Sequence, residues 1–144
     1  MRTVRSDSVR NCSLRPNYAV LGLALVLAGS TAMHLGNPKF FYGVVPPALC
    51  TDAGGRLGVL SRAQWVMLSA VPEAMAAVGL LIPATRKPAA TATALMFGAF
   101  TVGHLSALRR AFGPRGTPKA RLIHSLRLPL QVPLILWAWR LRGS

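Results

Sequence analysis

The stretch NYAVLGLALVLAGSTAMHL, residues 17–35, decides the fold because no charged side chain interrupts it. A membrane-spanning helix needs about 20 mostly apolar residues to cross a hydrocarbon core of roughly 30 Å. Basic residues precede this run, as in a signal peptide, but the run is longer than a typical signal core. We therefore expect an uncleaved transmembrane helix. Ala24, Ala28 and Ala32 recur every four residues within it and predict a ridge for close helix contact.

Three further apolar blocks follow, at residues 63–82, 88–108 and 123–141. The whole chain is 52% hydrophobic and 14% charged, whereas a soluble domain carries roughly a quarter charged residues. The fourth block is the least apolar because it includes His124 and Arg127. The sequence predicts an all-α fold, an integral membrane four-helix bundle over residues 17–141, preceded by a basic, disordered head at residues 1–16.

The connector between the first two blocks, residues 36–58, is long and unusual in composition. Its prolines and glycines interrupt helices, while its aromatic residues and valines keep it apolar. We expect a long interfacial loop that packs on the bundle. A chain of 144 residues has no room for a separate soluble catalytic domain.

The net charge of +14 raises the question of an acidic partner. The basic residues are divided among the connectors and the chain ends, so they favour the anionic headgroups of a lipid bilayer over nucleic acid, at about 1 kcal/mol per well-placed side chain. Because the two membrane sides receive similar numbers of basic residues, only the first span indicates an orientation. We expect a multi-pass protein of the cell membrane with cytoplasmic N- and C-termini.

The candidate site begins with Glu73, an acid in the second apolar block. A carboxylate at such depth costs about 2.5–3.5 kcal/mol on insertion scales unless it is paired or protonated. Hairpin topology brings the ends of the other spans to the same half of the bundle. The sequence therefore predicts a polar network or ligand site formed by His34, Glu73, His104, Arg127 and Gln131.

Two interpretations of this network remain open. It is either a structural network that fixes helix packing, with Glu73 paired to Arg127 or a histidine, or a pocket that binds a small ligand or passes protons. No nucleophile triad, phosphate loop or metal-ligand spacing is evident, and His34, His104 and Glu73 form only a weak candidate metal site. The sequence therefore predicts no metal and no evident cofactor.

Several short motifs, taken in order, resemble DoxX-like membrane proteins. They are MH at 33–34, NPKFF at 37–41, VPP at 45–47, SAVPE at 69–73, GLLIP at 79–83, RLPLQ at 127–131 and LWAW at 136–139. Pro72, directly before the glutamate, and the basic third connector depart from the family's pattern. The resemblance implies a four-helix membrane bundle, with functional positions at His34, Glu73, Arg127 and Gln131.

The resemblance also implies a function linked to redox chemistry. The expected protein is an accessory subunit that binds a quinone or another small apolar ligand beside a membrane or peripheral oxidoreductase partner. The alternative is a non-catalytic membrane scaffold or assembly factor. Since the chain carries no catalytic motif, it would be at most an accessory subunit of an enzyme.

Overall fold

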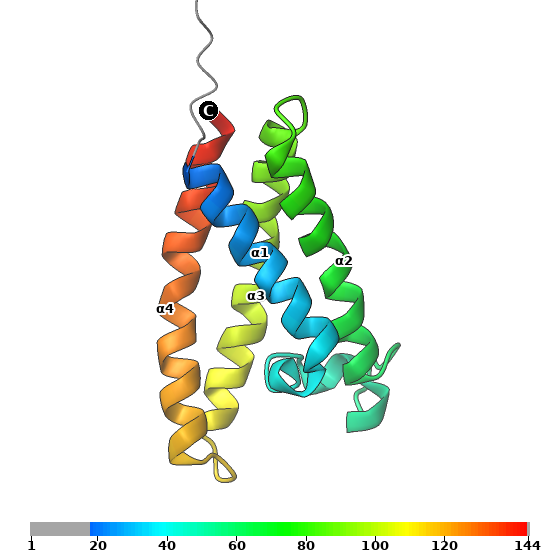
Figure 1. The fold of residues 1–144 in the computed structure, drawn as a ribbon. Helices are drawn as coiled ribbons and strands as arrows, with labels where there is room; N and C mark the ends of the chain where they lie inside the picture. Colours follow the sequence, from blue (N-terminus) through cyan, green and yellow to red (C-terminus); the bar gives the residue numbers. More distant parts are fainter. Residues whose placement is uncertain (1–17, 144) are drawn as a thin grey trace, which may run out of the picture.

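The computed structural model describes residues 18–143, in which the regular elements are all helices, with one isolated β-bridge between Cys50 and Leu60 (Figure 1). The long helices are α1 (Tyr18–Gly36), α2 (Arg62–Leu81), α3 (Arg86–Ala111) and α4 (Pro118–Arg140). Short 3-10 helices are η1 (Pro38–Phe41), η2 (Pro47–Leu49), η3 (Thr51–Ala53) and η4 (Leu141–Gly143). The predicted basic head at residues 1–16 lies outside the described residues.

Local capping determines where α2 and α4 begin. The Ser61 hydroxyl accepts from the Gln64 backbone N–H, and the Gln64 side chain accepts from the Ser61 N–H, which is a capping box. The Thr117 hydroxyl accepts from the Ala120 N–H, and Pro118 occupies the first helical position. Because of these signals α4 begins at Pro118. The sequence predicted a start at residue 123, where the apolar block begins.

The helices associate as two pairs, α1 with α2 and α3 with α4, and a short turn connects α2 to α3 (Figure 1). Near the chain ends, Trp137 joins α4 to α1: its indole N–H donates to the Ala19 carbonyl at 3.1 Å. Gly22 allows this approach, because a Cβ there would lie 3.0 Å from the Trp137 ring. From this junction α1 and α4 diverge, so the two pairs form a wedge that is open at its other end.

The hydrophobic core lies at the closed end of the wedge, where Leu23, Leu27 and Leu80 are fully buried. The predicted alanine ridge of α1 was wrong for Ala28 and Ala32, which are exposed, although Ala24 is buried. At 3.6 residues per turn, each step of four residues drifts by about 40°, and two steps beyond Ala24 carry the row away from the face that Leu23 and Leu27 bury.

The connector between α1 and α2 fills the open end of the wedge. The Arg110 guanidinium donates to the Gly43 carbonyl at 2.6 Å and so ties this loop to α3. Gly103 of α3 permits direct backbone contact, because a Cβ there would lie 2.8 Å from the Val44 carbonyl oxygen. The predicted long loop is therefore present and closes the end of the bundle.

The described residues include three helices that are long and apolar enough to cross a membrane, namely α1, α2 and α3. The helix α4 is not among them, because its sequence contains several basic and polar residues. The outer surface is nevertheless apolar on all four helices, with Leu25, Met75, Leu95 and Val132 each more than half exposed.

Candidate functional site

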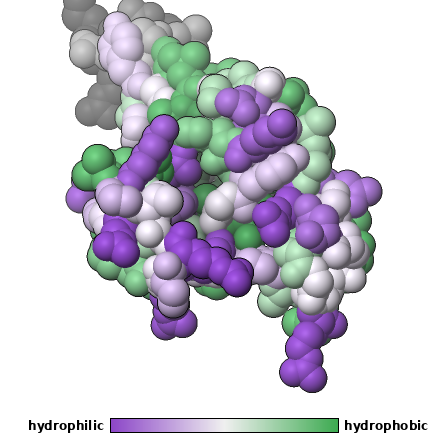
Figure 2. Space-filling view, turned by 90° about the horizontal axis from the view of Figure 1, so that it is seen from below, coloured by the Kyte–Doolittle hydropathy of each residue, from purple (hydrophilic) through white to green (hydrophobic). Residues whose placement is uncertain are grey.

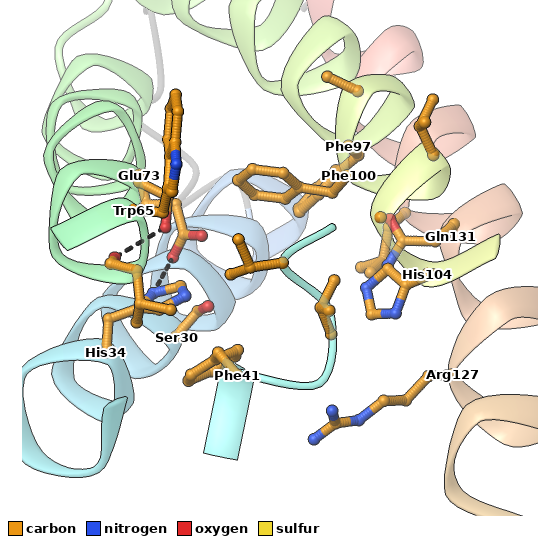
Figure 3. Close-up of a pocket in the computed structure, with 18 of the residues that line it drawn as sticks. Ser30, His34, Phe41, Trp65, Glu73, Phe97, Phe100, His104, Arg127 and Gln131 are labelled. Atoms are coloured by element: carbon orange, nitrogen blue, oxygen red, sulfur yellow. Dashed lines mark hydrogen bonds and ion pairs between the residues drawn. The ribbon is translucent and has the colours of Figure 1, made fainter. Parts of the chain in front are cut away.

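A cavity of about 450 Å³ lies between the two helix pairs, directly against the loop (Figure 3). The five residues that the sequence predicts for the site all line this cavity: His34, Glu73, His104, Arg127 and Gln131. Aromatic rings make up much of the remaining wall: Phe41, Trp65, Phe97 and Phe100. The structure thus brings the predicted residues together around one apolar space, and their role in binding stays a prediction.

An acid–imidazole pair forms the wall contributed by α1 and α2. Glu73 is 2% exposed and His34 is 5% exposed, and Glu73 Oε2 lies 3.3 Å from His34 Nδ1. The His34 ring also stacks on Phe41 of η1, with ring centroids 3.8 Å apart. Of the two partners predicted for Glu73, a histidine and Arg127, the structure pairs it with a histidine.

This pair is only partly satisfied. Among the described residues, neither Glu73 Oε2 nor His34 Nδ1 has a partner that meets the angular requirement of a hydrogen bond. A buried polar atom without a bond costs about 1–3 kcal/mol. The hydrogen-bonding capacity of the pair is therefore incompletely used, although both atoms are buried.

The opposite wall, from α3 and α4, carries His104, Arg127 and Gln131 (Figure 3). Gln131 is buried, and its Oε1 atom and the Nδ1 atom of His104 have no hydrogen-bond partner among the described residues. The Arg127 guanidinium instead lies 4.0 Å from the centre of the Phe40 ring, which is a cation–π contact. Two polar walls thus face each other across aromatic and aliphatic side chains.

Sequence reasoning missed several cavity residues. Ser30 precedes His34 by four residues, so it lies one turn away on the same face of α1 and lines the cavity. The spacing of four residues from His34 could therefore have identified Ser30 as a site residue. Phe41 and Val44 come from the connector, and no local pattern indicates which connector residues turn inward.

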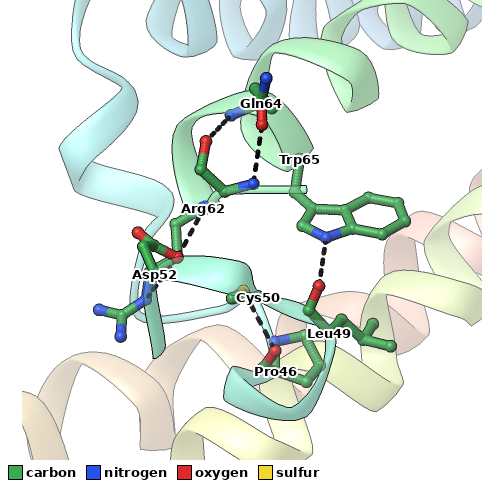
Figure 4. A network of polar contacts seen from close by, with 8 residues as sticks. Pro46, Leu49, Cys50, Asp52, Arg62, Gln64 and Trp65 are labelled. Carbon is green, nitrogen blue, oxygen red and sulfur yellow. Dashed lines mark hydrogen bonds and ion pairs between the residues drawn. The ribbon is translucent and has the colours of Figure 1, made fainter. Parts of the chain in front are cut away.

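A polar network anchors the loop beside the cavity (Figure 4). The Trp65 indole N–H donates to the Leu49 carbonyl at 2.8 Å, which fixes the ring in the cavity wall. Asp52 accepts from the Arg62 backbone N–H at 3.1 Å and lies 3.9 Å from its guanidinium. These contacts attach the loop to the first turn of α2.

Cys50 is a free, fully buried cysteine of this loop, and its Sγ donates to the Pro46 carbonyl at 3.3 Å. Burial raises the pKa of the Cys50 thiol, and the negative charge of Asp52 raises it further. The thiol is therefore protonated at neutral pH. The other cysteine, Cys12, lies outside the described residues.

The weak candidate metal site receives no support from the geometry. In the described part of the chain, no group of three or more His, Cys, Asp or Glu side chains gathers as metal ligands would. His34 and Glu73 lie on one wall of the cavity, and His104 lies on the other (Figure 3).

Fold and site together define a class of protein: a small four-helix protein with an apolar surface and a buried acid–imidazole pair in an apolar cavity. Over residues 23–142 the sequence matches the family described as Domain of unknown function (DUF8561), and the chain belongs to this family. The match includes all five predicted site residues. No curated protein and no solved structure matches the sequence.

Proposed function

We propose that the four helices cross a lipid bilayer and that the chain is a DoxX-like, redox-linked accessory subunit, which binds a quinone or another small apolar ligand in the cavity around Glu73. In this proposal it is a multi-pass protein of the cell membrane with both termini in the cytoplasm. An even number of spans is supported by the described chain ends, which lie at the same end of the bundle (Figure 1).

The fourth span is supported by the way α4 distributes its side chains. With 23 residues it is long enough for a bilayer, at about 1.5 Å of rise per residue. Its polar Arg127 and Gln131 line the cavity, while Leu126, Val132 and Leu136 are exposed on the outside. A helix with a polar inner face and an apolar outer face suits a position between lipid and a polar cavity.

The single observation that carries the ligand proposal is the incompletely bonded Glu73–His34 pair in an apolar cavity. A quinone head is a flat ring with carbonyl oxygens that accept hydrogen bonds. Hydrogen-bond donors in the cavity wall are available on His34, His104, Gln131 and Ser30, and Phe100 offers an apolar face for the ring. These residues fit such a head, and a cavity of about 450 Å³ is in the usual range for a small ligand.

A quinone bound there would accept two electrons and two protons. Glu73 and His34, whose Oε2 and Nδ1 atoms lie 3.3 Å apart, would supply one of the two protons to a carbonyl oxygen, and His104 on the opposite wall would supply the other. The apolar wall would exclude water from this transfer. The electrons would come from an oxidoreductase partner, because the sequence carries no evident redox centre.

The DoxX-like resemblance supports the same proposal from an independent direction. The residues that it carries over, His34, Glu73, Arg127 and Gln131, are distant in sequence and line one cavity.

The test replaces Glu73 by glutamine, which preserves size and removes the acid. In membranes that contain decylubiquinone as the probe, we expect Glu73→Gln to remain folded and to lose at least tenfold in quinone affinity. The matched control is Asp52→Asn, the same chemical change at a carboxylate outside the cavity. The asparagine Oδ1 still accepts from the Arg62 backbone N–H, so this variant should retain both properties. Unchanged affinity in Glu73→Gln would refute the ligand proposal, and loss of folded protein would favour a structural role for the pair.

The alternative function, a scaffold or assembly factor, is favoured by one surface. Hydrophilic side chains gather on the loop end of the bundle (Figure 2). They include eight basic residues: Lys39, Arg56, Arg62, Arg109, Arg110, Arg115, Lys119 and Arg121. The loop itself contributes one acid, Asp52. Such a surface suits anionic headgroups or an acidic partner protein, and mass spectrometry of material purified in mild detergent distinguishes the two.

A further inference from the structure

The cavity is not enclosed by protein on every side. Val26 of α1 and Leu130 of α4 both line it, and they are 42% and 56% exposed. The helices that carry them, α1 and α4, diverge along this side of the bundle (Figure 1). The helices α1 and α4 pack together less than α1 with α2, α2 with α3 or α3 with α4. Their contact near the chain ends depends on Trp137.

The position of these residues along their helices decides what lies outside the opening. Val26 is near the middle of α1, and Leu130 is near the middle of α4. In a bilayer, the middle of a spanning helix is surrounded by lipid chains, and water does not reach it. An opening at this depth therefore communicates with hydrocarbon.

The two ends of the cavity are closed by different means. At the loop end, Phe41, Val45 and Leu49 form the wall, and Gly103 contacts the backbone of Val44 directly. At the other end, the buried leucines of the core fill the wedge. A water-soluble molecule would have to displace one of these closures.

We propose that the cavity opens sideways into the bilayer between α1 and α4, and that its ligand is a bilayer-dissolved amphiphile with a polar head and a long apolar tail. The head lies at the Glu73–His34 pair, and the tail leaves between Val26 and Leu130 into the surrounding lipid. This inference rests on the membrane setting of the proposed function and adds the entry route and the need for a tail. A tail in this position continues the apolar surface of both helices.

The α2–α3 side is the competing route. Ala99 and Val102 of α3 also line the cavity and are exposed. The helices α2 and α3 are, however, connected by a short turn and pack together more extensively than α1 and α4. We therefore assign entry to the α1–α4 side, and Val102 supplies the control for the other side.

Access is measured with a cysteine placed in the cavity, Ser30→Cys, in a chain whose two native cysteines are serine. The reagents are membrane-soluble pyrenyl maleimide and a charged, water-soluble methanethiosulfonate, and the protein is reconstituted in bilayers. For each reagent, the labelling rate of Ser30→Cys is divided by the rate for a cysteine in the exposed loop, Thr51→Cys. This ratio should be at least tenfold higher for pyrenyl maleimide. Leu130→Trp should slow labelling by pyrenyl maleimide at least tenfold, and Val102→Trp should change it less than twofold. Should Leu130→Trp fold poorly, Leu130→Phe replaces it.

Three results would overturn the inference. The first is an equal ratio of labelling rates for the charged and the membrane-soluble reagent. The second is a labelling rate that Leu130→Trp does not change, and the third is a rate that Val102→Trp slows instead.

A second measurement separates this inference from the quinone proposal. Decylubiquinone should protect Ser30→Cys from labelling, and the same quinone ring without its tail should not. If neither compound protects the cysteine but Leu130→Trp still slows labelling, the quinone proposal is refuted and the lateral opening is supported. If decylubiquinone protects the cysteine equally well with and without Leu130→Trp, the lateral opening is refuted and the quinone proposal is supported.

Discussion

The contact between Gly103 and the loop offers a quantitative test of how the cavity is closed. A Cβ on Gly103 would lie 2.8 Å from the Val44 carbonyl oxygen and 3.0 Å from its Cγ1 atom. The first atom belongs to the backbone and cannot rotate away, so Gly103→Ala must displace the loop or bend α3. Overpacking of this kind costs about 1–3 kcal/mol. Alanine also gains about 0.5–1 kcal/mol over glycine within a helix.

Gly98 provides the matched control, since it lies in the same helix and no described atom would be within 4 Å of its Cβ. Gly98→Ala should therefore stabilise the protein by the helix term alone. The difference in unfolding free energy between the two variants isolates the clash, and we expect it to be about 1–3 kcal/mol. Reversible unfolding in mixed detergent micelles measures both values.

The same variant should also loosen the loop. With the clash at Val44, proteolysis of residues 42–60 should become faster in Gly103→Ala and stay unchanged in Gly98→Ala. If the two variants are equally stable within about 0.5 kcal/mol and are cleaved at the same rate, α3 and the loop are not in direct contact, and the argument for a closed cavity end is refuted.

Three further predictions concern the loop and its anchors. In a double-mutant cycle of Arg127→Gln and Phe40→Leu, the coupling energy should be about 0.5–2 kcal/mol, as expected for a cation–π pair 4.0 Å apart; no coupling would contradict the contact. Trp65→Phe keeps an aromatic ring but removes the bond to the Leu49 carbonyl, so it should cost about 1 kcal/mol in unfolding free energy, measured against wild type. Cys50, with its raised pKa, should resist iodoacetamide at pH 8 and react only at higher pH or on unfolding, because the thiolate is the reactive form. Rapid alkylation at pH 8 in the folded protein would show that Cys50 is accessible.

Hydropathy was sufficient to predict the helices. The apolar block at residues 63–82 corresponds to α2 (Arg62–Leu81), because a stretch long and apolar enough to cross a membrane is recognisable from composition alone. The start of α4 was predicted less well, since a capping threonine and a first-turn proline, and not hydropathy, determine it.

The candidate site was predictable only in part. Glu73 stands out in the sequence because an acid in an apolar segment has few acceptable environments, and the structure buries it beside His34. The choice of His34 over Arg127 was not predictable, because it depends on the divergence of the two helix pairs. That divergence leaves Arg127 beside Phe40 of the loop.

The amino-acid sequence by itself determined the number of long helices, their approximate limits and the polar residues that need a partner, because each follows from local composition and from the cost of burying charge. Only the tertiary structure decided which of these residues meet, how the loop packs against one end of the cavity, and that Val26 and Leu130 line the cavity while partly exposed. These features depend on the angles between helices and on contacts such as Gly22 with Trp137, which involve residues more than 100 positions apart and leave no local pattern.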